Sequence, residues 1–498
     1  MTDMELYRPD LLRAPLWRAE DLGKPLPPSP HANSVCLPTW GDVIDYEKAE
    51  PRVLGRLQTG YPRFFIHPLT VQLFAECARR FAGPDEFCHV YPSHAAALRS
   101  VESVRRWSGH QGRIQSWATA GPYVCCFPRA AEEAARKHWR HTGEGISSRH
   151  AEALLLGTPE SAASVAKRVV REQIAQWVGV PADSVYLFSS GMSAIYTVYR
   201  AVNRLFPGRR SVQFGFPYVD TLKLQQDLGP GAHFFPRGDE QDLHRFTELL
   251  RTEPVSAVYC EFPSNPLLVS PDLAALAELA ERHGFPLVVD ETLGTYVNVD
   301  LRPVADVLIT SLTKYFTGAG DVLAGAAILN PRGRWSLGLS DALAREYEDT
   351  LWGDDAVRLA QYAADFPERV QRINRTAEQV CDFCRSHPAI AEVYYPKFRT
   401  PGHYTAFQRT GGGYGGLFSL LLEDPAHTTP RFFDALQLCK GPNLGTYFSL
   451  CCPFTLLAHY QELDWAESCG VSRYLVRVSV GLEEPRDLIQ RLDEALQR

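Results

Sequence analysis

A lysine follows directly on a short aliphatic run in the second half of the sequence. The run, residues 304–310, has the length and composition of a buried strand, and the polar segment Ser311-Leu312-Thr313-Lys314 comes next. Burial lowers the pKa of a lysine amine and makes it a nucleophile that can form a Schiff base. The hydroxyls of Ser311 and Thr313 are suited to bind a phosphate beside that amine. Because lysine is seldom buried, a solvated lysine is the simpler alternative, and the remaining sequence has to distinguish the two.

Two other predicted strands also end in residues that can do chemistry. The strand at 184–188 is followed by Ser190-Gly191-Met192 and a helix, so free amides and the positive end of the helix dipole are available for an anion. A tight turn in which Ser190 caps the helix is the alternative. Asp290 closes the strand at 286–289, where it either caps a helix or is a buried acid that pairs with a cationic ring nitrogen.

Three further residues are candidates with structural alternatives. Tyr218, after Phe216-Pro217, offers an aromatic face in a loop beyond a strand, and core packing is the alternative. Asn265, in Ser264-Asn265-Pro266, is typical of a turn. Arg477 is a single cation in the apolar strand Leu475-Val476-Arg477-Val478-Ser479. It either pairs with an internal acid or uses its fork of donors for a substrate carboxylate.

The elements that must position these residues alternate between helix and strand from about residue 151. This pattern predicts a mostly parallel sheet with helices on both faces, in which ligands bind beyond the carboxyl ends of the strands. Lys314, Asp290, Ser190 and Glu261 all follow strand ends, which supports a common site. We predict helices at 161–178, from Met192 to Phe206, and at 271–282 with Ser270 as N-cap, and strands at 184–188, 211–216, 255–260, 286–289 and 304–310.

A chain of 498 residues is too long for one core, so we expect several domains. Residues 1–145 carry no catalytic pattern and form an N-terminal extension, which contains a helical segment at 69–81. The large domain is assigned to 146–385 and ends in a helical stretch at 342–386. Residues 386–498 are predicted to form a smaller α+β domain with strands at 415–422 and 474–480.

Composition narrows the function classes. The net charge of −7 gives no reason to expect nucleic acid or an acidic membrane surface as a partner. No apolar run is long enough to span a bilayer, and the first residues lack the pattern of a signal peptide, so we expect a cytoplasmic protein. The twelve cysteines show no repeated spacing, and Cys381-x-x-Cys384 lacks a second pair, so neither a metal site nor a disulfide is expected.

Taken together, the candidate residues match the requirements of pyridoxal 5′-phosphate. This cofactor needs a Schiff-base lysine, an acid at its pyridine nitrogen and an anion cradle for its phosphate. An aromatic ring against the cofactor and an arginine for an amino-acid carboxylate complete such a site. All five kinds of residue occur here, in a sensible order on a suitable sheet.

The motifs resemble the cystathionine γ-synthase family of pyridoxal-phosphate enzymes, which acts in transsulfuration of the sulfur amino acids. The resemblance covers roughly residues 145–498, and two segments, Gly145-Ile146-Ser147-Ser148-Arg149 and Thr455-Leu456-Leu457-Ala458-His459-Tyr460, are similar to the fungal branch. So is the segment from His31 to Trp40 in the extension. The motifs that carry it are Ser189–Ile195, Tyr218–Thr221, Glu261–Pro266, Asp290–Thr292, Ser311–Lys314 and Leu475–Glu483.

This resemblance implies an aspartate-aminotransferase-like large domain of fold type I and a role for each candidate. Lys314 would carry the cofactor and serve as the catalytic base, with Tyr218 stacked on the ring. The resemblance also implies a homodimer or homotetramer with active sites at the subunit interface. The remaining implied roles are Asp290 at the pyridine nitrogen, Gly191, Met192, Ser311 and Thr313 at the phosphate, Asn265 near the ring hydroxyl, Arg149 at the phosphate of a neighbouring subunit, and Arg477, helped by Ser449, at the substrate carboxylate.

Two departures from the family pattern bear on function. Many members have a tyrosine two residues before the arginine that matches Arg149, whereas Ser147 stands there in this chain. The segment 318–325 follows the general family more than the fungal synthases, which points to a changed substrate pocket. The expected reaction is γ-replacement on an O-activated homoserine by a second, nucleophilic substrate, either cysteine or a carbon nucleophile of a specialised pathway. γ-Elimination and a catalytically inactive scaffold are the alternatives.

Overall fold

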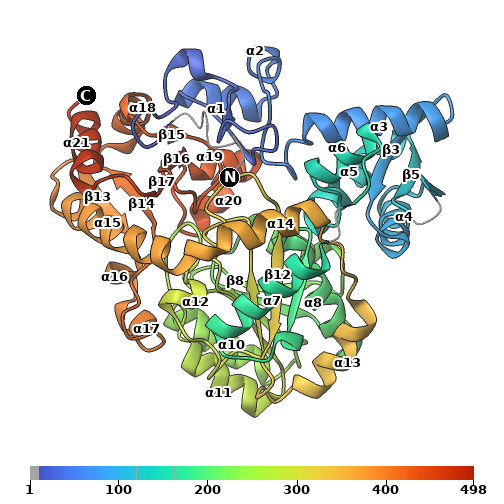
Figure 1. The fold of residues 1–498 in the computed structure, drawn as a ribbon. Coiled ribbons are helices and arrows are strands. Elements are labelled where there is room, and N and C mark those ends of the chain that lie inside the picture. Colours follow the sequence, from blue (N-terminus) through green and yellow to red (C-terminus); the bar gives the residue numbers. More distant parts are fainter. Residues whose placement is uncertain (1–9, 119–120, 161–162) are drawn as a thin grey trace.

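The computed structural model of the chain describes residues 10–118, 121–160 and 163–498 (Figure 1). A seven-stranded sheet, in the order β6-β12-β11-β10-β9-β7-β8, forms the centre of the large domain. Within this sheet β12 runs antiparallel to both of its neighbours, and the other strands are parallel to one another. The mostly parallel sheet predicted from the sequence is therefore confirmed. Its strands are β6 (Val185–Phe188), β7 (Ser211–Phe214), β8 (Ala232–Phe235), β9 (Val258–Glu261), β10 (Leu287–Asp290), β11 (Val307–Thr310) and β12 (Gly325–Leu329).

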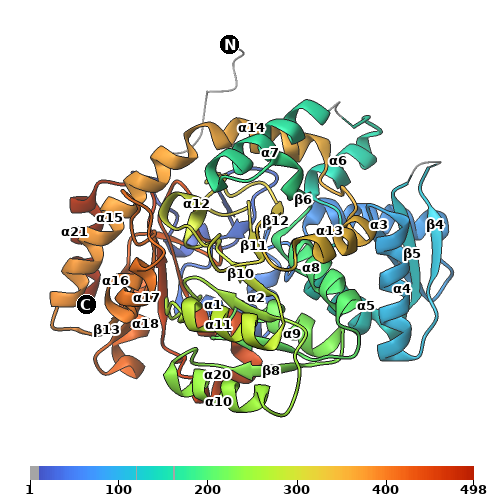
Figure 2. The ribbon, with the colours of Figure 1, turned by 90° about the horizontal axis from the view of Figure 1, so that it is seen from below.

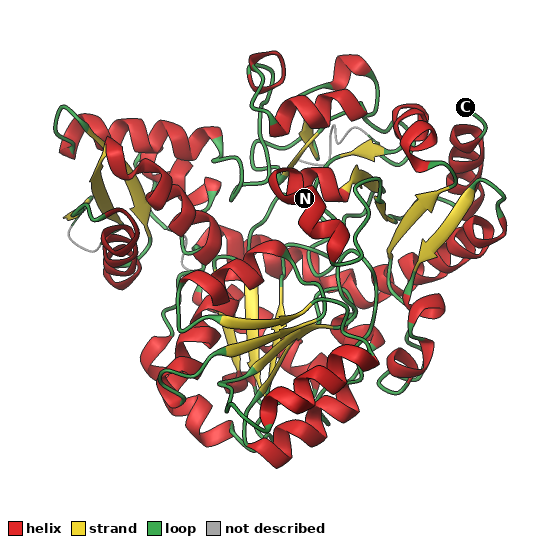
Figure 3. Ribbon diagram, turned by 180° about the vertical axis from the view of Figure 1, so that it is seen from behind, coloured by secondary structure: helices red, strands yellow, loops and turns green. Residues whose placement is uncertain are grey.

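Helices cover both faces of this sheet, as Figure 3 shows. Successive side chains of a strand point to opposite faces, and β10 illustrates this, because Val288 belongs to one core cluster and Val289 to the other. Both faces are thus apolar, as a parallel sheet between helices requires. The cluster around Val288 contains α8 (Gly191–Leu205) and α13 (Ser336–Glu346), and the cluster around Val289 contains α7 (Ser164–Val178), α10 (Glu240–Leu250) and α11 (Leu273–His283).

The C-terminal domain is built on a five-stranded sheet with the order β13-β14-β17-β16-β15. It follows the long helix α15 (Phe366–Ser386), which packs against β13, β14 and the last helix. The elements are β13 (Ile390–Tyr394), β14 (Leu417–Leu422), α18 (Pro425–Ala435), β15 (Cys439–Lys440), β16 (Leu450–Pro453), α19 (Phe454–His459), α20 (Leu463–Ser468), β17 (Val476–Ser479) and α21 (Pro485–Leu496).

The described residues from 10 to 156 form two separate structures. The segment before residue 68 packs against the C-terminal domain, where Leu11, Leu26 and Cys36 share an apolar cluster with Phe448 and Leu450. It includes β1 (Pro25–Leu26), β2 (Ser34–Val35), α1 (Trp40–Glu47) and α2 (Pro51–Leu54). The residues that follow form a small α+β unit at the opposite side of the molecule from α21 (Figures 1 and 2). Its elements are α3 (Pro68–Phe81), β3 (Glu86–Tyr91), α4 (His94–Ser108), β4 (Arg113–Ser116), β5 (Tyr123–Pro128), α5 (Glu132–Thr142) and α6 (Ser148–Leu156).

Some predicted elements differ from the structure. α11 begins at Leu273, and its N-cap is Asp272, whose carboxylate accepts a hydrogen bond from the amide of Ala275 at 3.0 Å. The predicted cap, Ser270, is therefore wrong, because the Asp272 side chain satisfies the first turn. The predicted helical stretch at 342–386 is divided among α13, α14 (Gly353–Tyr362) and α15. For the helix predicted at 161–178, residues 161 and 162 lie outside the described residues. Among the described residues, no helix combines the length and apolar character needed to cross a bilayer.

Candidate active site

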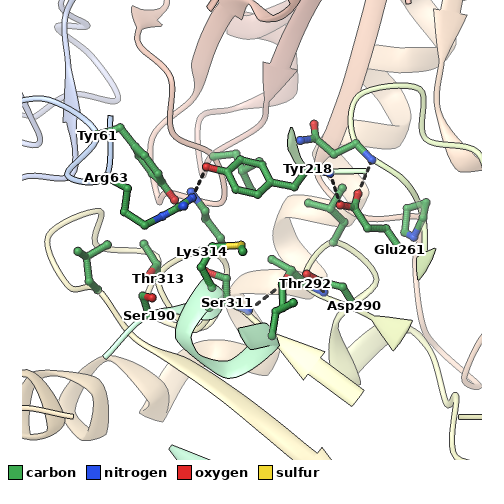
Figure 4. A pocket seen from close by; sticks show the side chains of 18 residues that line it. Tyr61, Arg63, Ser190, Tyr218, Glu261, Asp290, Thr292, Ser311, Thr313 and Lys314 are labelled. Carbon is green, nitrogen blue, oxygen red and sulfur yellow. Dashed lines mark hydrogen bonds between the residues drawn. The ribbon is translucent and has the colours of Figure 1, made fainter. Parts of the chain in front are cut away.

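A cavity of about 680 Å³ lies beyond the carboxyl ends of the central strands (Figure 4). Its walls come from the loops that follow β6, β7, β9, β10 and β11, which is where a parallel sheet binds ligands. The structure therefore brings together most of the residues singled out in the sequence. Those that line the cavity are Ser190, Gly191, Met192, Tyr218, Glu261, Asn265, Asp290, Ser311, Thr313 and Lys314.

Lys314 is buried, with 9% of its surface exposed. Its Nζ donates a hydrogen bond to Oδ1 of Asn443 at 2.5 Å and lies 4.6 Å from the centre of the Tyr61 ring. Burial lowers the pKa of this amine, and the charge of Arg477 acts in the same direction. The solvated lysine that the sequence left as an alternative is thus wrong, and the amine is placed as a nucleophile.

Two carboxyl groups, the buried Glu261 and the half-buried Asp290, stand side by side at the ends of paired strands. Glu261 accepts hydrogen bonds from the amides of Tyr218 at 2.5 Å and Asn265 at 2.8 Å, while Asp290 accepts one from Thr292 at 2.9 Å. Burial raises the pKa of both groups, and that of Glu261 reaches about 8. No cationic side chain of the described residues contributes to either shift. A protonated ring nitrogen of the cofactor would supply the missing cation.

The start of α8 forms an anion cradle on the other side of the cavity. Ser190 is the N-cap, and its Oγ accepts from the amide of Ser193 at 3.1 Å, so the capping alternative is correct for this hydroxyl. The amides of Gly191 and Met192 occupy the first helical positions, which have no acceptor within the helix. A Cβ at residue 191 would lie 3.0 Å from Cβ of Ser311, which is tighter than an ordinary contact, so glycine favours this close approach. The cradle fits a phosphate.

The hydroxyls of Ser311 and Thr313 differ in their availability. The Thr313 hydroxyl donates to the carbonyl of Ala324 at 3.2 Å and accepts from its amide at 3.0 Å. The backbone of the Ser311 loop is held by Thr292, whose Oγ1 accepts from the Ser311 amide at 2.8 Å (Figure 4). Thr313 therefore braces the loop through its hydroxyl, and Ser311 presents its hydroxyl beside Gly191.

Tyr61 and Arg63 also line the cavity, although the sequence analysis assigned them no chemistry. The Arg63 guanidinium donates to the Tyr218 hydroxyl (Figure 4). Through Nη1 it also donates to Asp220 at 2.5 Å. Asp220 is fully buried, and its Oδ1 accepts a hydrogen bond from Nδ1 of His141 at 3.0 Å. The sequence did contain an indication of these two residues. Tyr61 stands two positions before Arg63, which is the tyrosine–arginine spacing of the family that is missing at Arg149.

Arg149 and Ser449 lie outside this cavity. Arg149 is buried on α6 and donates to Asp355 at 3.0 Å and to Asp321 at 3.2 Å. Its predicted role at the phosphate of a neighbouring subunit stays a prediction. Ser449 donates its hydroxyl to Glu483 at 2.7 Å and accepts from the amide of Gly481. From the C-terminal domain, Asn443 contacts the lysine amine. Asn443 was not predicted from the sequence, because its loop has no recognisable pattern.

Arg477 lines a second cavity of about 700 Å³, which shares Tyr61, Tyr218, Asn265 and Lys314 with the first. Its guanidinium donates to Oδ1 of Asn265 at 3.1 Å and to the carbonyl of Pro442 at 2.9 Å. Within the described part of the chain, no hydrogen bond joins Arg477 to an acid. The internal ion pair is thus wrong, and the guanidinium remains suited to a substrate carboxylate.

Comparisons with known proteins agree with this geometry. Residues 162–497 match the family model described as Cys/Met metabolism PLP-dependent enzyme, and residues 70–147 match the fungal trans-sulfuration enzyme, N-terminal domain. The chain is 33% identical to cystathionine gamma-synthase of Neurospora crassa, over 96% of this chain and 98% of that protein. It is 34% identical to the cystathionine gamma-synthase-like enzyme iboG2 of Amanita muscaria, over 95% of this chain and 96% of that protein.

The fold comparison points the same way. The crystal structure of cystathionine gamma synthase from Xanthomonas oryzae pv. oryzae in complex with cystathionine has a TM-score of 0.59 and 25% identity, and the match covers 67% of this chain and 86% of that one. The predicted fold type I architecture and its pyridoxal-phosphate cofactor are confirmed. The chain belongs to the Cys/Met metabolism family of pyridoxal-phosphate-dependent enzymes and is cystathionine γ-synthase-like.

Proposed function

We propose that the enzyme catalyses γ-replacement on an O-activated L-homoserine, such as its O-acetyl or O-succinyl ester, and joins a nucleophile to Cγ. One observation carries this proposal. The buried amine of Lys314 lies in the wall shared by two cavities, one with the groups for a cofactor and the other with Arg477 for an amino-acid carboxylate. The similarity to cystathionine gamma-synthases and to cystathionine gamma-synthase-like enzymes supports the same reaction class.

The residues of the first cavity fit pyridoxal phosphate, which supplies an electron sink for charge that develops at the substrate Cα. Lys314 would hold its aldehyde carbon, and Asp290 its ring nitrogen. The amides of Gly191 and Met192 with Ser311 would hold its phosphate, while Tyr218 would present its ring to the pyridine. The fit rests on the adjacent acids Asp290 and Glu261, to whose raised pKa values no cation contributes, and on the close approach of Gly191 to Ser311.

Each remaining residue has a defined task in the reaction. Arg477 would bind the substrate carboxylate through two parallel hydrogen bonds, and Asn265 would keep its guanidinium in place. Lys314 would accept the proton from Cα, a role that its lowered pKa favours. Arg63 fixes the Tyr218 hydroxyl and thereby the plane of the ring. In the net reaction the Cγ–O bond breaks, its electron pair leaves with the carboxylate, and the nucleophile forms a new bond to Cγ.

The test is incubation of the purified enzyme with O-acetyl-L-homoserine and a panel of thiol and β-keto-acid nucleophiles, followed by product identification by mass. We expect a substitution product that carries the intact four-carbon amino acid, and no product from the Lys314→Ala variant. Release of acetate and ammonia with 2-oxobutanoate, and no substitution product, would favour γ-elimination. A wild-type protein without visible absorbance after incubation with the cofactor would favour the inactive scaffold.

γ-Elimination is the second candidate, and one comparison favours it. The chain is 33% identical to the L-2-amino-4-chloropent-4-enoate dechlorinase/desaturase of Streptantibioticus cattleyicolor, over 93% of this chain and 95% of that protein. The product assay above separates the two reactions, because elimination needs no second substrate.

A further inference from the structure

A third cavity, about 950 Å³ in volume, lies where the small α+β unit meets the large domain. One wall is the second half of α4, which contributes Arg99, Arg105 and Arg106. The opposite wall belongs to the large domain and contains Tyr196 of α8 and Leu228, the residue after α9 (Val219–Asp227). None of these residues lines the two cavities of the candidate active site. The third cavity is therefore a separate feature of the molecule.

The three guanidinium groups of this cavity differ in how their charge is compensated. Arg99 donates to Glu144 at 2.6 Å, so its charge is matched by an acid. Arg106 donates to a backbone carbonyl at the end of α9 and pairs with no carboxylate of the described residues. Arg105 has no side-chain partner in that part of the chain. The lining also includes Glu102, which is exposed and forms no ion pair there, so two arginines remain uncompensated.

Ser103 provides an independent indication that the cavity binds a ligand. It stands on α4 among the arginines and lines the cavity, and only 7% of its surface is exposed. Across the described ranges its hydroxyl makes no hydrogen bond, although a serine within a helix can donate to the carbonyl four residues before it. The helix dipole favours cations at the end of α4, which accounts for the arginines but not for an open hydroxyl. The hydroxyl is thus available to an acceptor in the cavity.

We propose that this cavity binds a phosphate-bearing small molecule, with Arg105 and Arg106 at the phosphate oxygens and the Ser103 hydroxyl as a further donor. Guanidinium groups bind phosphate through parallel N–H donors, and one phosphate offers acceptors to several donors at once. The Leu228 side chain gives the cavity an apolar wall for the organic part of the molecule. This site is independent of the proposed γ-replacement.

The cavity also contacts two helices that begin at the candidate active site. α8 begins at Gly191, whose amide belongs to the phosphate cradle, and α9 begins directly after Tyr218. Arg106 donates to the carbonyl of Asp227, the last residue of α9, at 2.8 Å. A phosphate that draws Arg106 into the cavity competes with this hydrogen bond. Occupation of the cavity should therefore change the position of α9 and, through it, the surroundings of the cofactor.

Inorganic pyrophosphate is a suitable probe, and the holoenzyme is titrated so that the cofactor already occupies the cradle. Calorimetric titration of the wild-type protein should show binding that weakens as the salt concentration rises. In Arg105→Gln and in Arg106→Gln the dissociation constant should rise about tenfold or more, because a hydrogen bond to a charged group contributes that much. Both arginines are exposed, so these variants should melt at the wild-type temperature.

Two further variants separate binding from structure. Ser103→Ala should weaken pyrophosphate binding without lowering the melting temperature, because the hydroxyl has no partner in the described protein and alanine favours a helix. Arg129→Gln removes an exposed arginine of the same α+β unit that does not line the cavity, and its dissociation constant should equal that of wild type. No binding at about 1 mM pyrophosphate, or equal dissociation constants in Arg105→Gln and Arg129→Gln, would overturn the site.

The visible circular dichroism of the bound cofactor provides the second readout. We expect pyrophosphate to change this band in wild-type holoenzyme with the half-saturation concentration that calorimetry gives. In Arg106→Gln the change should require a concentration about tenfold higher, in line with the weaker binding. Binding that leaves the band unchanged would overturn the link between the cavity and the cofactor.

Discussion

Asn443 accepts a hydrogen bond from Nζ of Lys314 although the two residues are 129 positions apart. The carbonyl of Asn443 also accepts from Nη2 of Arg477 at 3.3 Å. One loop of the C-terminal domain therefore contacts both the amine that would carry the cofactor and the guanidinium that would bind the substrate. The two domains meet at the reacting groups, so the position of the C-terminal domain determines the geometry of the site.

Asn443→Asp tests the environment of the lysine amine. A carboxylate beside Nζ favours the ammonium form and should raise the pKa of Lys314, so that neutral amine becomes available only at higher pH. We expect the rate at which pyridoxal phosphate reconstitutes the apoenzyme to rise at a higher pH than in wild type, as followed by visible absorbance. Asn443→Ser, which keeps a neutral acceptor, should show the wild-type pH dependence. An identical profile for the aspartate variant would contradict the contact.

Asp290→Asn should have opposite effects on the apoenzyme and on cofactor binding. Without the cofactor the substitution removes a half-buried acid that has no cationic partner, so we expect the melting temperature of the apoenzyme to rise or stay constant. Cofactor affinity should fall by about 100-fold or more, because breaking a buried charge pair costs about 3 kcal/mol. Calorimetric melting and titration with pyridoxal phosphate measure the two effects. A destabilised apoenzyme would mean that Asp290 has a structural partner.

Glu261 should make the stability of the apoenzyme depend on pH. Its pKa rises from 4.5 to about 8 on folding, because burial and the neighbouring Asp290 disfavour the carboxylate. The unfolded chain therefore loses this proton first as pH rises, so the contribution to stability is complete below pH 4.5 and is lost between pH 4.5 and 8. Denaturant unfolding of the apoenzyme across this range should show a falling free energy of unfolding. Glu261→Gln should flatten the slope, and a slope of the opposite sign would refute the assignment.

The position of Arg63 predicts which chain completes each active site. Arg63 reaches Tyr218 of its own chain, so Arg63→Ala should weaken cofactor binding in the same chain that carries the substitution. When Arg63→Ala chains are co-expressed with Lys314→Ala chains, each active site still carries one of the two substitutions. We therefore expect no recovery of activity at limiting cofactor concentration. Recovery would show that neighbouring subunits exchange this segment.

Arg149 provides the matched comparison. Its ion pairs with Asp321 and Asp355 are buried, so Arg149→Leu should lower the free energy of unfolding by about 3 kcal/mol. If the pairs are its whole role, cofactor affinity stays as in wild type. A loss of affinity that co-expression with Lys314→Ala restores would instead support the predicted contact with the phosphate of a neighbouring subunit, and light scattering would then show at least a dimer.

The sequence around Lys314, Asp290 and Gly191 could be interpreted because these candidate site residues stand next to recognisable strand and helix patterns. Each of these residues lies at the end of an aliphatic run or at the start of an amphipathic helix, and a parallel sheet gathers such ends at one edge. Strand β12 was missed because its residues, Gly325-Ala-Ala-Ile-Leu, include few of the β-branched and aromatic types that mark strands. Its place in the sheet depends on pairing with β6 and β11.

By itself the sequence predicted the mostly parallel sheet and placed Lys314, Asp290 and Ser190 at strand ends along one edge of it, since each prediction depends on neighbours within a few residues. Only the tertiary structure decided that Tyr61 and Arg63, and not Arg149, face the cavity, and that Asn443 contacts the amine. These residues stand in loops or at a helix end, where no periodicity indicates a direction. Their positions depend on how the N-terminal segment packs on the C-terminal domain, and such long-range packing leaves no local signal in the sequence.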